Sequence, residues 1–256
     1  MKEPIIIPVD HLNQEPYSSL LCFPSPSETE SRSRLEELKR HGVTALEFSG
    51  TNSLFGVPLP ILGKGFVGIV AIGHLNGERV AIKIRRVDSD RSDLFHEAKM
   101  LFKANSVNVG PKLVAGSKNF LLMQLIIGNV LPNWLKTTKG TSAARRVLSE
   151  VLEQCFRLDQ IELDHGELSK APKHLLVDIE EQVYIVDFET ASAERRPANV
   201  TAVCQYLFAG NSSASKSLTE ILGEIKMSDL IVALRAYKNE RNRNNFEKLF
   251  EVCVTR

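Results

Sequence analysis

The dipeptide Asn76-Gly77 stands between two runs rich in β-branched residues, and no other feature of the sequence constrains the fold as strongly. The first run is Ile69 to Ile72 and the second is Arg79 to Ile84. Asn-Gly accepts the positive φ angles that a two-residue hairpin turn demands. The two runs are therefore predicted to pair as antiparallel strands, within a β-rich segment at residues 58–123 that also contains one helix.

A glycine-rich motif precedes the hairpin. It fits G-x-G-x-x-G-x-V, and its members are Gly63, Lys64, Gly65, Phe66, Gly68 and Val70. The Rossmann dinucleotide fold shares this spacing, but it needs a helix after the glycines and an acid about 20 residues later. Asp88 meets the second condition, whereas the hairpin takes the place of the helix. The glycines are expected to form a β-turn whose backbone N–H groups can approach a triphosphate; a merely tight turn is the alternative.

A lysine follows the apolar residues of the second run. Burial of Lys83 on such a strand is costly unless an anionic partner is close. Residues 91–104 are predicted to form a helix that starts at Asp90 or Ser92. Its expected packing face consists of Leu94, Phe95, Ala98, Leu101 and Phe102. Glu97 shares that face, which predicts a Lys83–Glu97 ion pair; the alternative is a Glu97 side chain that reaches water from the edge of the face.

These motifs resemble the protein-kinase-like superfamily, and most closely the RIO-type and related archaeal atypical Ser/Thr protein kinases. The resemblance covers residues 63–208. It implies an α+β, bilobal fold with a small antiparallel β lobe carrying one helix, followed by a helical C-terminal lobe. It also implies that ATP lies between the lobes, with Lys83 on its phosphates.

The resemblance assigns further nucleotide contacts to the strands of the small lobe and to the segment that joins the lobes. Phe120 to Gly128 is similar to this joining segment, with Met123 as the residue beside the adenine. The backbone of Gln124 to Ile126 is expected to bond the adenine edge. The implied nucleotide-binding set, beyond the glycine motif, is Ala81, Lys83, Glu97, Met123, Gln124, Leu125 and Ile126.

The segment Leu163 to Ser169 looks like the catalytic loop H-G-D-L-S of RIO-type and aminoglycoside-type kinases. It keeps the histidine and glycine but has Glu167 where the family has its catalytic aspartate. A glutamate can also accept the proton of an attacking hydroxyl, on a stem one methylene longer. Glu167 is the favoured base because it occupies the position of the catalytic aspartate in the motif. Asp164 is the alternative, with a loop-capping role as its other interpretation.

The segment Tyr184 to Glu189 resembles the D-F-G metal-binding motif. Asp187 follows an apolar strand and precedes an aromatic residue, where a magnesium ligand is expected; a turn-capping aspartate is the alternative. His174 stands 13 residues earlier, at the position of the metal-binding asparagine if the loop carries a two-residue insertion. Imidazole favours softer metals such as Mn²⁺ over Mg²⁺. A purely packing or hydrogen-bonding His174 is equally compatible with the sequence.

The residues after this motif differ from those of a regulated protein kinase. Glu189 replaces the motif glycine, so a positive φ is unfavourable there and an easy flip of the segment is not expected. No A-P-E motif follows. Arg195 and Arg196 either meet a phosphate or lie in a solvated turn. Helices are predicted at 142–158, 200–208, 217–226 and 228–252.

Composition excludes several partners. The 256 residues include 32 Lys and Arg against 31 Asp and Glu, a net charge of +1, which gives no electrostatic case for nucleic acid or an anionic membrane. The basic residues near Arg86 alternate with aspartates. The four cysteines lack zinc-site spacing and are expected to be buried thiols. No apolar stretch has the length of a membrane span, so a cytoplasmic protein is predicted.

The predicted organisation has three parts. Residues 1–55 form an N-terminal extension with a helix at 28–40, ended by Gly42, and a strand at 43–48; this extension either packs on the small lobe or gates the site. Residues 56–127 form the small lobe and residues 128–256 the helical lobe.

The predicted function is ATP- and Mg²⁺- or Mn²⁺-dependent phosphoryl transfer to a Ser or Thr of a protein, including autophosphorylation. One alternative is a nucleotide-binding, catalytically weak module that acts as an ATPase or a regulatory subunit. Another is a small-molecule kinase of the aminoglycoside or choline kinase type.

Overall fold

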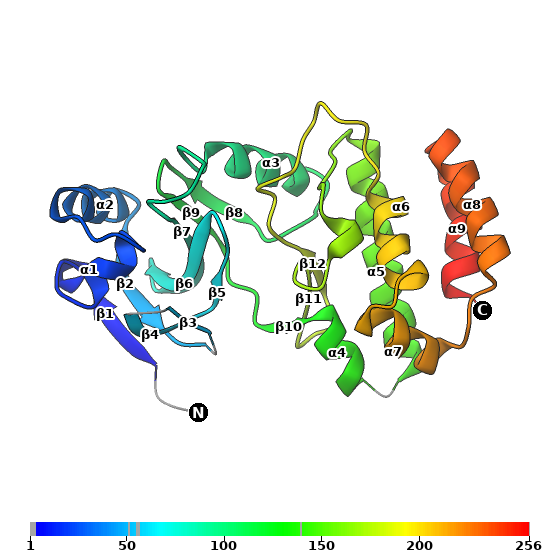
Figure 1. Ribbon diagram of the computed structural model, residues 1–256, viewed down its shortest axis with the longest axis horizontal. Coiled ribbons are helices and arrows are strands. Elements are labelled where there is room, and N and C mark those ends of the chain that lie inside the picture. The colour runs from blue at the N-terminus through cyan, green and yellow to red at the C-terminus, as the bar shows by residue number, and fades with distance from the viewer. Residues whose placement is uncertain (1–3, 51, 55–56, 139, 256) are drawn as a thin grey trace. The chain divides into compact units, whose positions relative to one another are not determined.

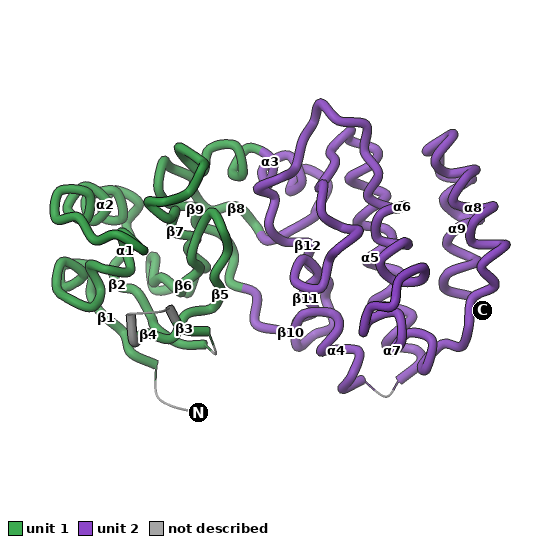
Figure 2. Tube along the Cα trace, in the orientation of Figure 1, with its two compact units in different colours: residues 1–99, 112–125 green, residues 100–111, 126–256 purple. Residues whose placement is uncertain are grey.

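The computed structural model is an α+β protein and describes residues 4–50, 52–54, 57–138 and 140–255. It divides into two compact units (Figure 2). Unit 1 comprises residues 1–99 and 112–125, and unit 2 comprises residues 100–111 and 126–256. The expected boundary between residues 55 and 56 lies outside the described residues.

An antiparallel sheet forms the centre of unit 1 (Figure 1). Its strand order is β1-β2-β6-β7-β9-β8, and β5 also pairs with β6. The strands are β1 (Ile5–Pro8), β2 (Val43–Phe48), β5 (Gly63–Lys64), β6 (Gly68–Leu75), β7 (Glu78–Arg85), β8 (Leu113–Gly116) and β9 (Phe120–Gln124). A separate pair consists of β3 (Asn52–Leu54) and β4 (Val57–Ile61).

The predicted hairpin is confirmed. Strands β6 and β7 pair antiparallel along their full lengths, from Gly68 opposite Arg85 to Leu75 opposite Glu78. Asn76 and Gly77 have φ angles of 52° and 83°, the positive values that this turn needs. The glycine motif joins β5 and β6, so it is a β-turn and no helix follows it.

The two faces of this sheet are covered by different segments. The main apolar core of the unit lies on the face that contains Ile69, Ile82 and Phe120, and it includes residues of η1 (Val9–His11), α1 (Tyr17–Leu21) and α2 (Glu28–Arg40). A smaller cluster on the opposite face joins Leu121 to Leu94 and Ala98 near the start of α3 (Phe95–Asn105). Residues 5–48 are thus integral to the sheet and its core.

A buried arginine fastens α2 to the rest of unit 1. Arg34 is fully buried, and its Nη1 donates to the carbonyl oxygens of Leu21, at 2.7 Å, and Arg85, at 2.5 Å. Its Nε donates to Glu30. One turn further on, the Glu37 carboxylate accepts from the backbone N–H and the side-chain amide of Asn119, at 2.9 and 2.8 Å. Helix α2 therefore provides hydrogen-bond partners for backbone groups at the end of β7 and just before β9.

Helix α3 differs from its predicted form in its start and in its buried face. It begins at Phe95 rather than Arg91, and Asp93 accepts the Phe95 N–H at 3.0 Å, so Asp90 and Ser92 do not cap it. Leu94, Ala98 and Leu101 are buried as expected. Phe95 and Phe102 are 55% and 69% exposed, because a full apolar stripe of this width exceeds what the small cluster can cover.

Unit 2 is mainly helical. Its helices are α4 (Leu131–Thr137), α5 (Thr141–Gln160), α6 (Asn199–Cys204), the wider-turned η3 (Gln205–Ala209), α7 (Ser213–Leu222), α8 (Met227–Asn239) and α9 (Arg243–Val254). It also contains a three-stranded antiparallel sheet, which consists of β10 (Gly128–Val130), β11 (Leu175–Asp178) and β12 (Val183–Ile185). The short helix η2 (Leu168–Lys170) precedes β11 in the sequence. All four cysteines are buried, as predicted.

The C-terminal helices correct two predictions. The segment 228–252 is two helices rather than one, because the Asn242 side chain accepts the Asn245 N–H and starts α9 anew. The helix expected at 217–226 begins at Ser213, capped by Ser212, and ends at Gly223, whose φ is 86°. Within the described part of the chain, no helix combines the length and apolar character needed to cross a membrane.

Replacement of Arg34 by Met is expected to lower the free energy of unfolding by about 2–4 kcal/mol, because buried carbonyl oxygens lose their donor. Arg32→Met is the matched control on the same helix. Among the described residues Arg32 pairs with exposed Glu28, so its loss should cost less than about 1 kcal/mol. Urea unfolding measures both values, and equal losses in the two variants would contradict the anchoring role of Arg34.

Candidate functional site

Lys83 and Glu97 form a buried ion pair in unit 1. Lys83 Nζ lies 3.0 Å from Glu97 Oε1 and 2.8 Å from Oε2, and both side chains are buried. The pairing predicted from the sequence is present, so Glu97 does not reach water. Two charges are costly to remove from solvent, so a buried pair of this kind marks a candidate functional site.

The glycine turn packs directly against this lysine. A Cβ atom on Gly68 would lie 2.9 Å from both Lys83 Cγ and the Ile84 carbonyl oxygen, so only glycine fits there. The Gly65 N–H donates to the Gly68 carbonyl oxygen at 2.8 Å, which closes the turn. Phe66 at its tip is 92% exposed. The turn thus brings backbone close to the Lys83 side chain.

Strand register places the other predicted nucleotide contacts of unit 1 on one face of the sheet. Val70 lies opposite Lys83, and Ala81 lies opposite Met123. Because cross-strand partners and alternate residues share a face, these four side chains point to the same side. The Gln124 N–H donates to the Lys112 carbonyl oxygen at 2.8 Å, so this one of the predicted backbone contacts is already engaged within unit 1.

Asp164 is occupied by structural contacts. Its Oδ2 accepts from Arg195 Nε at 2.9 Å, and its Oδ1 accepts from the Ala198 N–H at 3.1 Å. Its backbone also pairs with Ser192 in both directions. These contacts match the loop-fixing interpretation of Asp164. They also show that Arg195 binds a carboxylate of its own chain, while Arg196 donates to the Lys238 carbonyl oxygen.

Three side chains that could ligate a metal meet in unit 2. One ligand atom each from Glu167, His174 and Asp187 lies within 4.8 Å of the others. His174 Nε2 is 3.2 Å from Glu167 Oε2, and its Nδ1 is 3.9 Å from Asp187 Oδ2. The His174 carbonyl oxygen accepts the Val186 N–H at 2.9 Å, which fixes the two segments side by side. The sequence predicted His174 at the position of the metal-binding asparagine, after a two-residue insertion in the loop. In the structure His174 lies beside Asp187.

The backbone of Asp187 is strained. Its φ is 71°, in the left-handed region that residues other than glycine seldom adopt. Among the described residues with positive φ, Asp187 appears and Glu189 does not. The sequence predicted that a positive φ is unfavourable at Glu189, and the structure agrees at that position. Strain held at a candidate metal ligand is a mark of functional sites.

His165 connects the segments that carry these ligands. Burial, with a smaller contribution from His174, lowers the pKa of His165 to about 4, so the ring is neutral at pH 7. Its Nε2 lies 3.0 Å from the Val186 carbonyl oxygen, which assigns the ring proton to Nε2. The ring also makes edge contacts with His174 and Phe188, at centroid distances of 5.4 and 5.1 Å. One neutral imidazole therefore holds the backbone before Asp187.

Sequence reasoning missed the polar network beneath this loop. The Asn199 side chain accepts the His165 N–H at 2.9 Å and donates to Leu163 and to Asp159. Asp159 also accepts from the hydroxyl group of Tyr237 at 2.9 Å. Burial raises the pKa of the Asp159 carboxyl. The available signal was Asp159 itself, an acid that continues the apolar stripe one residue beyond the helix predicted at 142–158.

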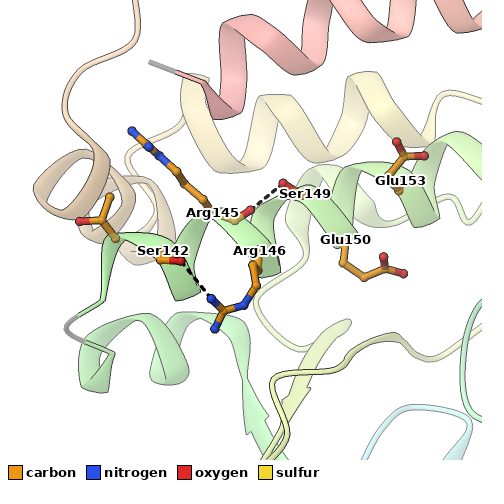
Figure 3. Close-up of a pocket in the computed structure, with 7 residues that line it drawn as sticks. Ser142, Arg145, Arg146, Ser149, Glu150 and Glu153 are labelled. Atoms are coloured by element: carbon orange, nitrogen blue, oxygen red, sulfur yellow. Dashed lines mark hydrogen bonds between the residues drawn. The ribbon is translucent and has the colours of Figure 1, made fainter.

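The open pocket on α5 contains none of the predicted site residues (Figure 3). It is lined by Thr141, Ser142, Arg145, Arg146, Ser149, Glu150 and Glu153. Figure 3 shows Arg146 donating to Ser142, and Arg146 also pairs with Glu181. Glu153 pairs with Arg243. The charges of this pocket are balanced by residues of the same unit.

Comparison with known proteins adds no assignment. No family model matches the chain, and no curated protein matches it. The functional argument therefore depends on the residues and their geometry.

Replacement of Tyr237 by Phe is expected to lower the free energy of unfolding by about 1–2 kcal/mol, because Asp159 loses a buried donor. Tyr206→Phe is the matched control: the Tyr206 hydroxyl is buried without a hydrogen-bond partner among the described residues, so its removal should be neutral or stabilising. Thermal and urea unfolding compare the two. Equal effects would show that the Tyr237 hydroxyl contributes nothing specific to the network.

Proposed function

We propose that the protein is an ATP-dependent phosphotransferase with a kinase-like fold that transfers phosphate to a Ser or Thr hydroxyl of a protein. The observation that carries the proposal is the buried Lys83–Glu97 pair with the Gly68 turn packed against the lysine. A glycine turn lets backbone N–H groups approach phosphates, and a carboxylate holds the ammonium in position to bind them. The sheet face shared by Val70, Ala81 and Met123 would supply apolar contacts for the adenine base.

The residues of unit 2 fit a divalent cation. Two carboxylates and an imidazole, from Glu167, Asp187 and His174, are donors that suit Mn²⁺ and accept Mg²⁺. The cation would neutralise phosphate charge during transfer. Asp187 is the best ligand candidate, because its backbone is held in a strained conformation and its neighbour Val186 is fixed by His165.

Glu167 is the better of the two candidate bases. Asp164 uses both carboxylate oxygens on Arg195 and Ala198, and its side chain is buried. Glu167 is partly exposed, and its one described side-chain contact is with His174. A general base must reach the hydroxyl that it deprotonates, so exposure favours Glu167.

A second candidate function is a nucleotide-binding module with weak or no transfer activity. It is favoured by the 3.2 Å contact between Glu167 and His174, because a carboxylate engaged by an imidazole or a metal is less free to act as a base. Transfer to a small-molecule alcohol rather than to a protein uses the same residues. The acceptor is therefore distinguished by experiment rather than by the site.

The kinase proposal predicts that label from γ-labelled ATP appears on the protein or on a generic Ser/Thr substrate in the presence of Mg²⁺ or Mn²⁺. Lys83→Met and Asp187→Asn should each reduce this transfer by at least about 100-fold. The first removes the positive charge that would bind the phosphates, and the second removes the carboxylate that would bind the metal. Asn tolerates positive φ, so Asp187→Asn should remain folded.

Lys99→Met is the matched control, because Lys99 is an exposed lysine on α3 two residues from Glu97. It should retain full transfer activity. ATP binding by the wild-type protein without transfer to protein, small alcohol or water would reject the kinase proposal and support the binding module. Transfer that persists in Lys83→Met would also contradict it.

The choice of base predicts different results for two isosteric variants. Glu167→Gln should reduce kcat at least about 100-fold with ATP affinity unchanged within about twofold. Asp164→Asn should lower the melting temperature, because it removes the negative charge that pairs with Arg195 and one of two acceptor oxygens, and it should reduce kcat less than about tenfold. The reverse pattern would assign the base to Asp164.

A further inference from the structure

Phe23 lies outside every motif of the sequence, yet it contacts the glycine turn. Its ring is buried within the core of unit 1. Lys64 Nζ, from the turn, lies 5.0 Å from the ring centroid, and the guanidinium carbon of Arg86 lies 5.2 Å from it. Both distances are within the range of cation–π attraction. The ring of Phe23 thus contacts two cations, and one of them, Lys64, belongs to the turn.

The position of Phe23 is fixed by its backbone. Its carbonyl oxygen accepts the Val87 N–H at 3.0 Å, just after strand β7. Two residues earlier, the Leu21 carbonyl oxygen accepts from the buried Arg34 at 2.7 Å. The segment before α2 is therefore tied to the same end of the sheet from which the glycine turn projects.

Arg86 completes the attachment. Its backbone N–H donates to the Val67 carbonyl oxygen at 2.8 Å, and its Nη1 donates to the Gly65 carbonyl oxygen at 3.3 Å. Asp88 holds the guanidinium through two bonds, at 2.8 and 2.6 Å. Asp88, the acid about 20 residues after the glycine motif, thus orients an arginine that holds the turn.

We propose that Phe23 is a positioning residue for the glycine turn at residues 63–68, so that the N-terminal extension supports the proposed nucleotide site from behind the turn. The proposal rests on the proposed ATP-binding function for its consequence and on the contacts of Phe23 for its structure. A turn that is ordered before binding loses less conformational freedom on binding, and this strengthens affinity without a direct contact to the ligand. Phe23 acts through Lys64 and Arg86 and does not itself touch a nucleotide.

The test compares amide hydrogen exchange in the nucleotide-free, full-length protein. In Phe23→Leu, the hydrogen-bonded amides of Gly65 and Arg86 should exchange about 3–10 times faster than in wild type, because the leucine offers no ring face to the cations. Phe23→Tyr retains the ring and should restore the wild-type rates. Phe48→Leu, which removes a phenylalanine stacked on Tyr17 in the same core, controls for general destabilisation.

A second measurement links the turn to the ligand. Phe23→Leu should raise the Kd for ATP about 3–10-fold and change kcat less than twofold, whereas Phe48→Leu at a temperature of equal folded fraction should leave Kd unchanged. Unaltered exchange at Gly65 and Arg86 in Phe23→Leu, or the same acceleration in Phe48→Leu, would overturn the positioning role. Faster exchange with an unchanged Kd would overturn its link to the nucleotide. A wild-type protein that binds no ATP would reject the proposed function, while the exchange rates still decide the attachment of the turn.

Discussion

The burial of Lys83 with Glu97 is the interaction on which much of unit 1 depends. A buried ion pair persists only where its surroundings hold both partners in good geometry, since desolvation offsets most of the Coulomb attraction. Strand β7 carries the lysine and α3 carries the glutamate. Gly68 lets the neighbouring backbone pass close to the lysine stem. The sheet, the helix and the glycine turn therefore meet at one pair of charges.

In unit 2 a hydrogen-bonded network of polar side chains holds the candidate site. His165, uncharged because it is buried, joins its own loop to the backbone before Asp187, and Asn199 joins that loop to Asp159 on α5. Such networks are stabilising only when their members are paired, so they define one arrangement of the loop. Glu167, His174 and Asp187 are carried on segments that this network holds, which is why three candidate ligands lie within reach of one another.

Local patterns in the sequence predicted the elements whose signals are themselves local. The Asn76-Gly77 hairpin, the helix at 28–40 and the pairing of Lys83 with Glu97 depend on turn chemistry, periodicity and the cost of a buried charge. The errors arose where a choice depends on distant residues. Periodicity alone could not show that Phe95 and Phe102 remain exposed, because exposure depends on what packs against the helix.

The sequence by itself determined the β-hairpin, the glycine turn and the identity of the polar residues that could perform chemistry. Only the tertiary structure decided how those residues are used. It engaged Asp164 with Arg195, gave Asp187 the positive φ, and brought Phe23 from the N-terminal extension to Lys64 of the glycine turn. The physical reason is that hydrogen-bond partners, burial and side-chain packing are set by contacts between residues far apart in the chain, and one sequence read locally does not specify those contacts.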